Sequence, residues 1–254
     1  MELDGMIVTA YINSMPAKNA LKNYAEDGFY HVYNRGVNKR RIFTDKQDYS
    51  VFLSYLKTYL SFLDKKKLDA VLADNETTGQ EKERIRKLLG LNNFFGRIEL
   101  LAYCLMPNHF HFIFKQADKM AMEFMMRSLM TRYTMYLNRK LKRVGSLFQG
   151  VYKAVLITTD EQLLYLSRYI HRNCLSPSRT LPGGESLKEL LMVQPSSYLN
   201  YLGEIKQEWV KPEFILQNFS ESGFDSYESF ISDEDADEEI KSAHLLAGLE
   251  LDKE

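Results

Sequence analysis

The stretch LLAYCLMPNHFHFIFKQ, residues 100–116, decides the fold of this 254-residue chain. Its apolar first half, Leu100 to Met106, meets a Pro107-Asn108 corner and is followed by alternating histidine and phenylalanine. Such a corner between two runs is typical of a β-hairpin, and side chains of a strand alternate between the two faces of a sheet. The pattern predicts one face with His109, His111 and Ile113 and a buried face with Phe110, Phe112 and Phe114.

The spacing of His109 and His111 is compatible with two kinds of site. Two neutral imidazoles at i and i+2 on one strand can both reach one divalent metal ion. A His-x-His pair can equally be two polar side chains on a solvated strand face. The spacing alone leaves both interpretations open.

Length and composition indicate one domain, or one domain with an appendage. Hydrophobic residues make up 45% and charged residues 26% of the chain. No stretch approaches the roughly 20 consecutive apolar residues of a membrane span. The N-terminus MELDGMIVTAYINS is acidic where a secretory signal is basic. Cys104 and Cys174 are the two cysteines and give no disulfide framework, so we expect a protein of the reducing cytoplasm.

The net charge of −1 conceals a segregation of charge along the chain. Residues 29–173 hold 25 lysines and arginines against 13 acidic residues, whereas residues 174–254 hold 6 against 17. A basic body with an acidic tail favours a polyanion such as nucleic acid as the partner of the body. Ordinary solvated surface charge is the alternative.

Hydrophobic periodicity predicts an alternation of strands and helices. The expected elements are a strand at 29–33, a helix at 45–63, a hairpin of strands at 94–105 and 109–115, a helix at 120–143, a strand at 151–157 and a helix at 161–171. This β-α-β-β-α-β order followed by a helix is that of an α+β, ferredoxin-like split βαβ fold with an antiparallel sheet.

The segments around this core differ from it in charge and periodicity. The charged stretch 64–92 carries a polar break and predicts an insertion of two short helical pieces. We expect four segments in all: an N-terminal arm at 1–28, a core domain at 29–175, a helical C-terminal extension at 176–231 that packs on the core, and an acidic, solvated tail at 232–254.

Four short motifs resemble the HUH single-strand DNA nucleases, and in particular the REP-associated and insertion-sequence-type single-tyrosine transposases. They are Tyr-His-Val-Tyr-Asn-Arg-Gly at 30–36, Met-Pro-Asn-His-Phe-His at 106–111, Gly-Ser-Leu-Phe-Gln-Gly at 145–150 and Tyr-Ile-His-Arg-Asn at 169–173. The resemblance extends from Phe29 to about Trp209. The chain departs from the family at Val151, where the family usually has arginine, and at Cys174, where it usually has proline.

The resemblance implies a site built from the histidine strand and the last core helix. In the family, the tyrosine of the Tyr-Ile-x-x-Asn segment is the nucleophile and the asparagine completes the metal site. Carried over, this makes Tyr169 the catalytic residue. It makes His109, His111 and Asn173 the ligands of Mg²⁺ or Mn²⁺.

The implied activity is cleavage and rejoining of single-stranded or hairpin DNA through a 5′-phosphotyrosine intermediate, as in DNA transposition. No small-molecule cofactor and no membrane partner are expected. Two alternatives stay open, namely a DNA-binding protein with a decayed active site and a metal-dependent nuclease that uses water. Relatives work as dimers or monomers. We expect a monomer here, because the extra C-terminal segment could cover a dimer surface.

Other residues have two alternative roles each. Tyr165, one helical turn before Tyr169, is the alternative nucleophile. His31 is expected to be a structural histidine of the first strand, with third metal ligand as the alternative role. Basic residues that follow the strands or line the helices are candidates for phosphate contact, with plain surface charge as the alternative. They are Arg35, Lys39, Arg40, Arg132, Arg143, Lys153 and Arg172.

Overall fold

The computed structural model describes residues 24–175, 195–217, 219 and 225–232. Most of the expected N-terminal arm, the start of the expected C-terminal extension and nearly all of the expected acidic tail therefore lie outside the described residues. No helix in the part of the chain that is described is long and apolar enough to cross a membrane.

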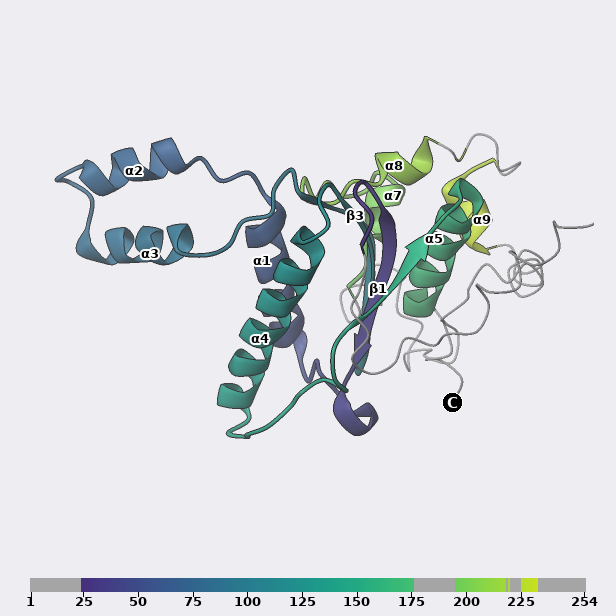
Figure 1. Cartoon of the computed structure of the whole chain (residues 1–254), viewed down its shortest axis with the longest axis horizontal. Coiled ribbons are helices and arrows are strands. Elements are labelled where there is room, and N and C mark those ends of the chain that lie inside the picture. Colours follow the sequence, from purple (N-terminus) through teal and green to yellow (C-terminus); the bar gives the residue numbers. More distant parts are fainter. Residues whose placement is uncertain (1–23, 176–194, 218, 220–224, 233–254) are drawn as a thin grey trace, which may run out of the picture.

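Four antiparallel strands form one sheet in the order β2-β3-β1-β4. Their bounds are β1 Phe29–Arg35, β2 Ile98–Met106, β3 His109–Gln116 and β4 Lys153–Ile157. Helical connections join β1 to β2 and β3 to β4, whereas β2 and β3 form a hairpin (Figure 1). This is the split βαβ arrangement, so the predicted ferredoxin-like fold is confirmed.

Helices cover both faces of the sheet and give the molecule three layers (Figure 1). On one face lie α1 Lys46–Leu60 and α4 Ala121–Lys140. On the other face lie α5 Asp160–Leu175 and three short helices, α7 Tyr198–Tyr201, α8 Glu213–Leu216 and α9 Tyr227–Ser232. A 3-10 turn, η2 Val37–Lys39, follows β1.

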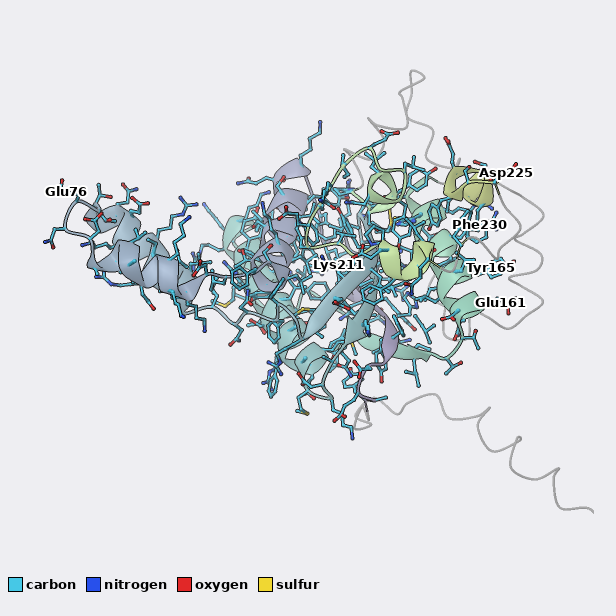
Figure 2. The ribbon with its side chains drawn as sticks, turned by 90° about the horizontal axis from the view of Figure 1, so that it is seen from above. Glu76, Glu161, Tyr165, Lys211, Asp225 and Phe230 are labelled. Atoms are coloured by element: carbon cyan, nitrogen blue, oxygen red, sulfur yellow. A yellow bond between two sulfur atoms is a disulfide. The ribbon has the colours of Figure 1, made fainter. Side chains whose placement is uncertain are left out.

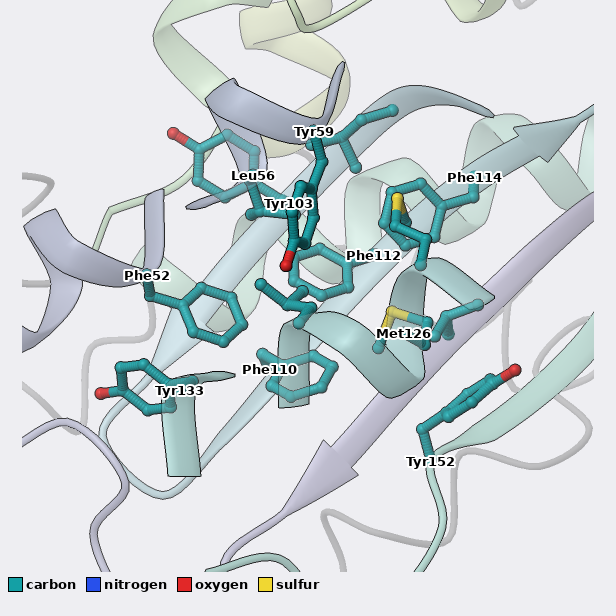
Figure 3. Close-up of a cluster of buried hydrophobic side chains, with 14 of the residues drawn as sticks. Phe52, Leu56, Tyr59, Tyr103, Phe110, Phe112, Phe114, Met126, Tyr133 and Tyr152 are labelled. Carbon is teal, nitrogen blue, oxygen red and sulfur yellow. The ribbon is translucent and has the colours of Figure 1, made fainter. Parts of the chain in front are cut away.

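The phenylalanines of β3 form the centre of the core between the sheet and the α1–α4 layer (Figure 3). Phe110, Phe112 and Phe114 are fully buried, and each contributes roughly 1.5–3 kcal/mol through burial. Phe52 of α1 packs with its ring centroid 5.7 Å from that of Phe110, and Tyr133 of α4 stands perpendicular to Phe52. Ile113 belongs to the cluster on the opposite face, so the predicted division of β3 into two faces is confirmed.

Several elements begin or end at residues other than those predicted, and the backbone gives the reason. Left-handed turns at Gly96 and Gly150 delay the start of β2 and β4. A left-handed residue at Lys142 ends α4 before Arg143. In contrast, α5 continues past His171 to Leu175, because its last turn still packs on the sheet face.

The charged insertion forms α2 Lys65–Ala73 and α3 Gly79–Leu89, as two predicted helical pieces. The pair projects away from the three layers, with Glu76 at the far end of the projection (Figures 1 and 2). Asp64 caps α2 by accepting from the backbone N–H of Lys67, and Thr78 caps α3 in the same way from Glu81. Most side chains of α2 and α3 are exposed to solvent. Ile85 is the one buried residue of these two helices, so the projection has little core of its own.

β2 is an edge strand, and the chain that begins at Pro195 covers its outer side. The backbone N–H of Leu105 donates to Pro195 O, and that of Ser197 donates to Tyr103 O, both at 3.0 Å. An open edge would present unpaired backbone groups to other chains. Residues 195–197 therefore protect this edge of the sheet.

Cys104 of β2 and Cys174 of α5 form a disulfide across 70 residues of sequence. The prediction that the two cysteines give no disulfide is therefore wrong, and the cysteines no longer support a reducing compartment. A bulge between Leu100 and Ala102 shifts the register of β2 against β3. As a result, Cys104 lies opposite His111 and on the face that α5 covers.

Candidate active site

Two rows of side chains cross the α5 face of the sheet near the start of β3. Paired residues of antiparallel strands share a face. The first row, from β2 to β4, is Cys104, His111, Tyr33 and Lys153, and the second is Met106, His109 and Arg35. Each histidine is therefore flanked by a sulfur-containing residue on the β2 side and by a basic residue on the side of β1 and β4.

His109 and His111 both use Nδ1 for a hydrogen bond inside the sheet. His109 Nδ1 lies 2.6 Å from Asn108 Oδ1, and His111 Nδ1 lies 2.9 Å from His31 Nε2. The two ligand candidates are 9% and 0% exposed, and their ring centroids are 5.0 Å apart. Their Nε2 atoms are also enclosed by protein. The structure thus brings the two predicted imidazoles together and buries them.

Burial keeps His31 and His111 uncharged. Burial lowers the pKa of His31 to about 3. Burial, reinforced by repulsion from His31 and His109, holds the pKa of His111 well below its ordinary value of 6.5. A neutral imidazole offers a lone pair, which a metal ion requires of a histidine ligand.

α5 places Tyr169 beside His111, with Asn173 one helical turn further along. The helix begins with Thr159 Oγ1 accepting from the backbone N–H of Gln162, and residues four apart then lie on one face. The Tyr169 ring stands perpendicular to that of His111, with centroids 5.8 Å apart. Tyr169 Oη and Asn173 Nδ2 are shielded from solvent and have no hydrogen-bond partner among the described residues. Such groups are uncommon in folded proteins and call for a hydrogen-bond partner such as a bound ligand.

Tyr165 lies elsewhere on the same helix. Its ring packs against Phe230 of α9, with centroids 5.6 Å apart, and Figure 2 shows the two side by side. On α5, the ring of Tyr169 packs against His111. The geometry therefore favours Tyr169 over Tyr165 as the nucleophile.

The donor groups fit a hard divalent cation. Among the described residues, no group of three His, Cys, Asp or Glu side chains can hold a metal ion. A third protein ligand would therefore be of another residue type, and Asn173 is the candidate from the sequence. Two imidazoles and an amide oxygen form a mixed N/O set that suits Mn²⁺ or Mg²⁺ when water and phosphate complete the shell. Asn173 also lies in the last turn of α5, where the helix dipole is negative and favours a cation.

The basic residues predicted to contact DNA lie in two groups. Arg35 and Lys153 share the histidine face; Arg35 donates to Gln149 Oε1, and Lys153 Nζ lies 5.7 Å from the Tyr33 ring centre. Lys39 and Arg40 are exposed at the turn after β1.

The other predicted contacts are not part of this face. Arg132 and Arg143 lie on or just beyond α4, in the opposite layer, where Arg132 stacks 3.8 Å from the Tyr55 ring centre and Arg143 donates to Asn138 and Ser146. Arg172 lies on α5, between the candidate nucleophile and Asn173.

Two residues of the cluster were not identified from the sequence. Asn108 accepts the hydrogen bond of His109, and Tyr33 lies beside both His31 and His111, with centroid distances of 4.8 and 5.8 Å. Strand alternation already places Tyr33 on the face of His31. That signal was available, whereas the contact of Asn108 depends on the shape of the corner.

Comparison with known proteins relates part of the chain to a family. Residues 74–173 match the sequence model of a family described as "Transposase IS200 like", a segment that contains both histidines, Tyr169 and Asn173. The match confirms the family resemblance over three of the four motifs, those at 106–111, 145–150 and 169–173. No curated protein matches the sequence. A solved structure titled "Structure of the REP associates tyrosine transposase bound to a REP hairpin" is similar with 12% identity and a TM-score of 0.44, over 76% of this chain and 96% of that chain.

Proposed function

We propose that this chain, whose residues 74–173 match the model of the IS200-like transposase family, cleaves and rejoins single-stranded or hairpin DNA through a covalent bond to Tyr169. One observation carries the proposal. Tyr169 and Asn173 of α5 bring unpartnered buried polar atoms to the same side of the sheet as His109 and His111. A nucleophile, a metal site and flanking cations are the parts that phosphodiester transfer requires.

Tyr169 acts as the nucleophile in the first step. Its Oη attacks the phosphorus of the scissile phosphodiester, and the phenol proton passes to solvent. The bond from phosphorus to the 3′-oxygen of the preceding nucleotide breaks, and that oxygen takes up a proton. The products are a 5′-phosphotyrosine and a free 3′-hydroxyl.

His109, His111 and Asn173 are the residues that would hold the divalent ion. When bound, Mg²⁺ or Mn²⁺ withdraws charge from the scissile phosphate and lowers the barrier to attack by an oxygen nucleophile. The neutral state of His111 leaves its imidazole able to act as a ligand. Arg35 and Lys153, on the same face, hold the flanking phosphates.

The second step reverses the first. A 3′-hydroxyl attacks the phosphotyrosine phosphorus, the bond to Tyr169 Oη breaks, and Tyr169 recovers its proton. The covalent bond preserves the energy of the phosphodiester, so strands are rejoined without an external energy source. The partner is single-stranded or hairpin DNA. The active form is a monomer, in which residues 195–197 cover the β2 edge.

The test uses a 5′-labelled and a 3′-labelled hairpin DNA from beside the gene, incubated with the full chain and Mn²⁺ or Mg²⁺. We expect the 3′ label to migrate with the protein on a denaturing gel, because a 5′-phosphotyrosine holds the 3′ part of the strand. This signal should disappear with a chelator. Cleavage without an adduct would point to water as nucleophile, and binding without cleavage to a decayed site.

The position of the adduct can be read without a mutation. Trypsin cuts after Lys153, Arg168 and Arg172, which separates peptide 154–168 with Tyr165 from peptide 169–172 with Tyr169. Mass spectrometry after nuclease trimming is expected to find the nucleotide on 169–172. A nucleotide on 154–168 would move the nucleophile by one helical turn.

A further inference from the structure

His31 is a buried histidine that the reaction outlined above does not use. It lies on β1, opposite Ile113 of β3 and Val155 of β4, and is 3% exposed. Diagonal neighbours on adjacent strands come within reach of long side chains, and His31 Nε2 reaches His111 Nδ1 at 2.9 Å. Its ring plane lies within 13° of that of His111. His31 therefore touches a candidate ligand at its Nδ1 atom.

A hydrogen bond between two neutral imidazoles contains one proton, and its position has a consequence. If His31 Nε2 donates, the other ring keeps its own proton on Nε2 and has no lone pair there for a cation. If His111 Nδ1 donates, His111 Nε2 carries the lone pair. Since Nδ1 is engaged with His31, Nε2 is the nitrogen that remains for a metal ion.

We propose that His31 is a positioning residue for the metal site: it accepts the Nδ1–H of His111 and holds that ring in the tautomer and orientation in which Nε2 binds the ion. Partners of this kind fix the tautomer of metal-binding histidines and affect metal affinity. His31 orients its partner without adding negative charge, unlike a carboxylate. The inference rests on one part of the proposed function, the metal site at His109 and His111. It does not depend on any step of DNA cleavage.

Asn108 has the corresponding place beside the other ligand. Its Oδ1 accepts from His109 Nδ1 at 2.6 Å, and an amide oxygen can only accept. Both histidines would then present Nε2 to the ion and Nδ1–H to the protein. The shared pattern supports the donor and acceptor roles assigned to the His31–His111 pair.

The first test measures binding of Mn²⁺ alone to the full chain by EPR, without DNA. His31→Gln retains an acceptor oxygen, whereas His31→Leu has none. We expect His31→Leu to bind Mn²⁺ about 10–100-fold more weakly and His31→Gln to stay within about 3-fold of the wild-type chain. His109→Ala shows which site is measured: if Mn²⁺ binds at the histidines, this variant loses the Mn²⁺ binding that EPR detects in the wild-type chain.

A matched control separates positioning from loss of stability. Val32→Ala alters the next residue on β1, which is fully buried in the opposite layer. It is expected to lower the unfolding midpoint and leave Mn²⁺ affinity unchanged. Equal affinities in wild type and His31→Leu, or equal losses in His31→Leu and His31→Gln, would overturn the proposal.

The second test reads the protons directly. In the chain with Mg²⁺ and ¹⁵N-labelled histidine, we expect NMR to show a protonated Nδ1 on His111 and an unprotonated Nε2 on His31. A proton on His31 Nε2 overturns the proposal. Both tests are independent of DNA, so a failed adduct experiment with a positive result here rejects the cleavage mechanism and not the metal site. Absence of any Mn²⁺ binding that depends on His109 rejects the inference itself.

Discussion

The aromatic ring of Tyr169 stands at 89° to the imidazole of His111, with ring centroids 5.8 Å apart. Tyr169→Phe removes the buried phenol oxygen of the proposed nucleophile and keeps the ring that packs on the histidine. We expect loss of the DNA adduct by at least about 10³-fold. Hairpin affinity and Mn²⁺ affinity are expected to be unchanged. Adduct formation is measured on denaturing gels, and binding by filter assay and EPR.

Tyr165→Phe is the matched control for this substitution. It removes the same hydroxyl from the same helix, but its ring packs on Phe230 instead of a histidine. Adduct formation is expected to stay within about 2-fold of wild type, the usual effect of a change away from the reacting atoms. The assignment is wrong if Tyr165→Phe loses the adduct and Tyr169→Phe retains it.

Arg35 and Lys153 flank the histidines on the same face of the sheet, and we expect each to contact one phosphate of a bound strand. Arg35→Gln and Lys153→Met should weaken hairpin binding at low salt. Each should also reduce the slope of log affinity against log salt concentration by about 0.7, the value for one phosphate of a single strand. Fluorescence anisotropy between 50 and 300 mM salt measures both quantities.

Lys66→Met on the exposed surface of α2 is the control, because it removes one positive charge far from the histidines. Lys66→Met is expected to change hairpin affinity only slightly and by the same factor at every salt concentration. A salt slope that falls for Lys66→Met and not for Lys153→Met would put the DNA on the projecting helices. The same measurement on Arg132→Gln tests the opposite layer, where that guanidinium stacks on Tyr55.

The sequence predicted the parts of the fold that depend on local periodicity. The alternation in residues 109–114 separated a buried phenylalanine face from a histidine face, because the two-residue period of a strand leaves no other arrangement. The helical spacing of Tyr169 and Asn173 likewise placed them on one face of α5. The order of strands followed from the order of elements.

Contacts that depend on strand pairing and on turns were not predictable in this way. The His31–His111 hydrogen bond requires β1 to lie beside β3 in one register. The Cys104–Cys174 bond requires, in addition, the bulge between Leu100 and Ala102 and the extra turn of α5. None of these has a local sequence signal, because each depends on segments far apart in the chain.

The Cys104–Cys174 disulfide is expected to stabilise the chain, because it joins β2 to the helix of Tyr169 and closes a loop of 70 residues. Loss of a bond that closes a loop of this size costs about 2–4 kcal/mol of unfolding free energy. We expect Cys104→Ser together with Cys174→Ser to lower the unfolding free energy by that amount, and the urea midpoint with it. Urea unfolding followed by circular dichroism measures it.

Reductant provides the control for the cysteine variant. It should lower the midpoint of the wild-type chain towards that of the double variant and leave the double variant unchanged. If wild type unfolds identically with and without reductant, the two thiols are not joined in solution.

Asp48 joins α1 to α4 and is expected to make the stability of the chain depend on pH in the acid range. It is fully buried and accepts from Thr44, from Tyr136 Oη and from Lys140 Nζ, the last at 2.6 Å. Burial raises the pKa of this carboxyl, but the hydrogen bonds from Lys140 and Thr44 outweigh it and hold the pKa below its ordinary value of 3.8. The folded state therefore binds this proton at a lower pH than the unfolded chain does.

The contribution of Asp48 is complete above the unfolded value of 3.8 and is lost as pH falls through the lower folded value. Asp48→Asn should cost about 2–3 kcal/mol at pH 7, below the usual value for breaking a buried pair because Lys140 also pairs with Asp45. The difference from wild type should be the same at pH 5 and shrink below pH 4, as measured by urea unfolding at each pH. Asp45→Asn, at a half-exposed carboxylate on the same lysine, should cost much less. A cost for Asp48→Asn that persists unchanged at pH 3 would mean that shape, and not charge, makes Asp48 important to the α1–α4 contact.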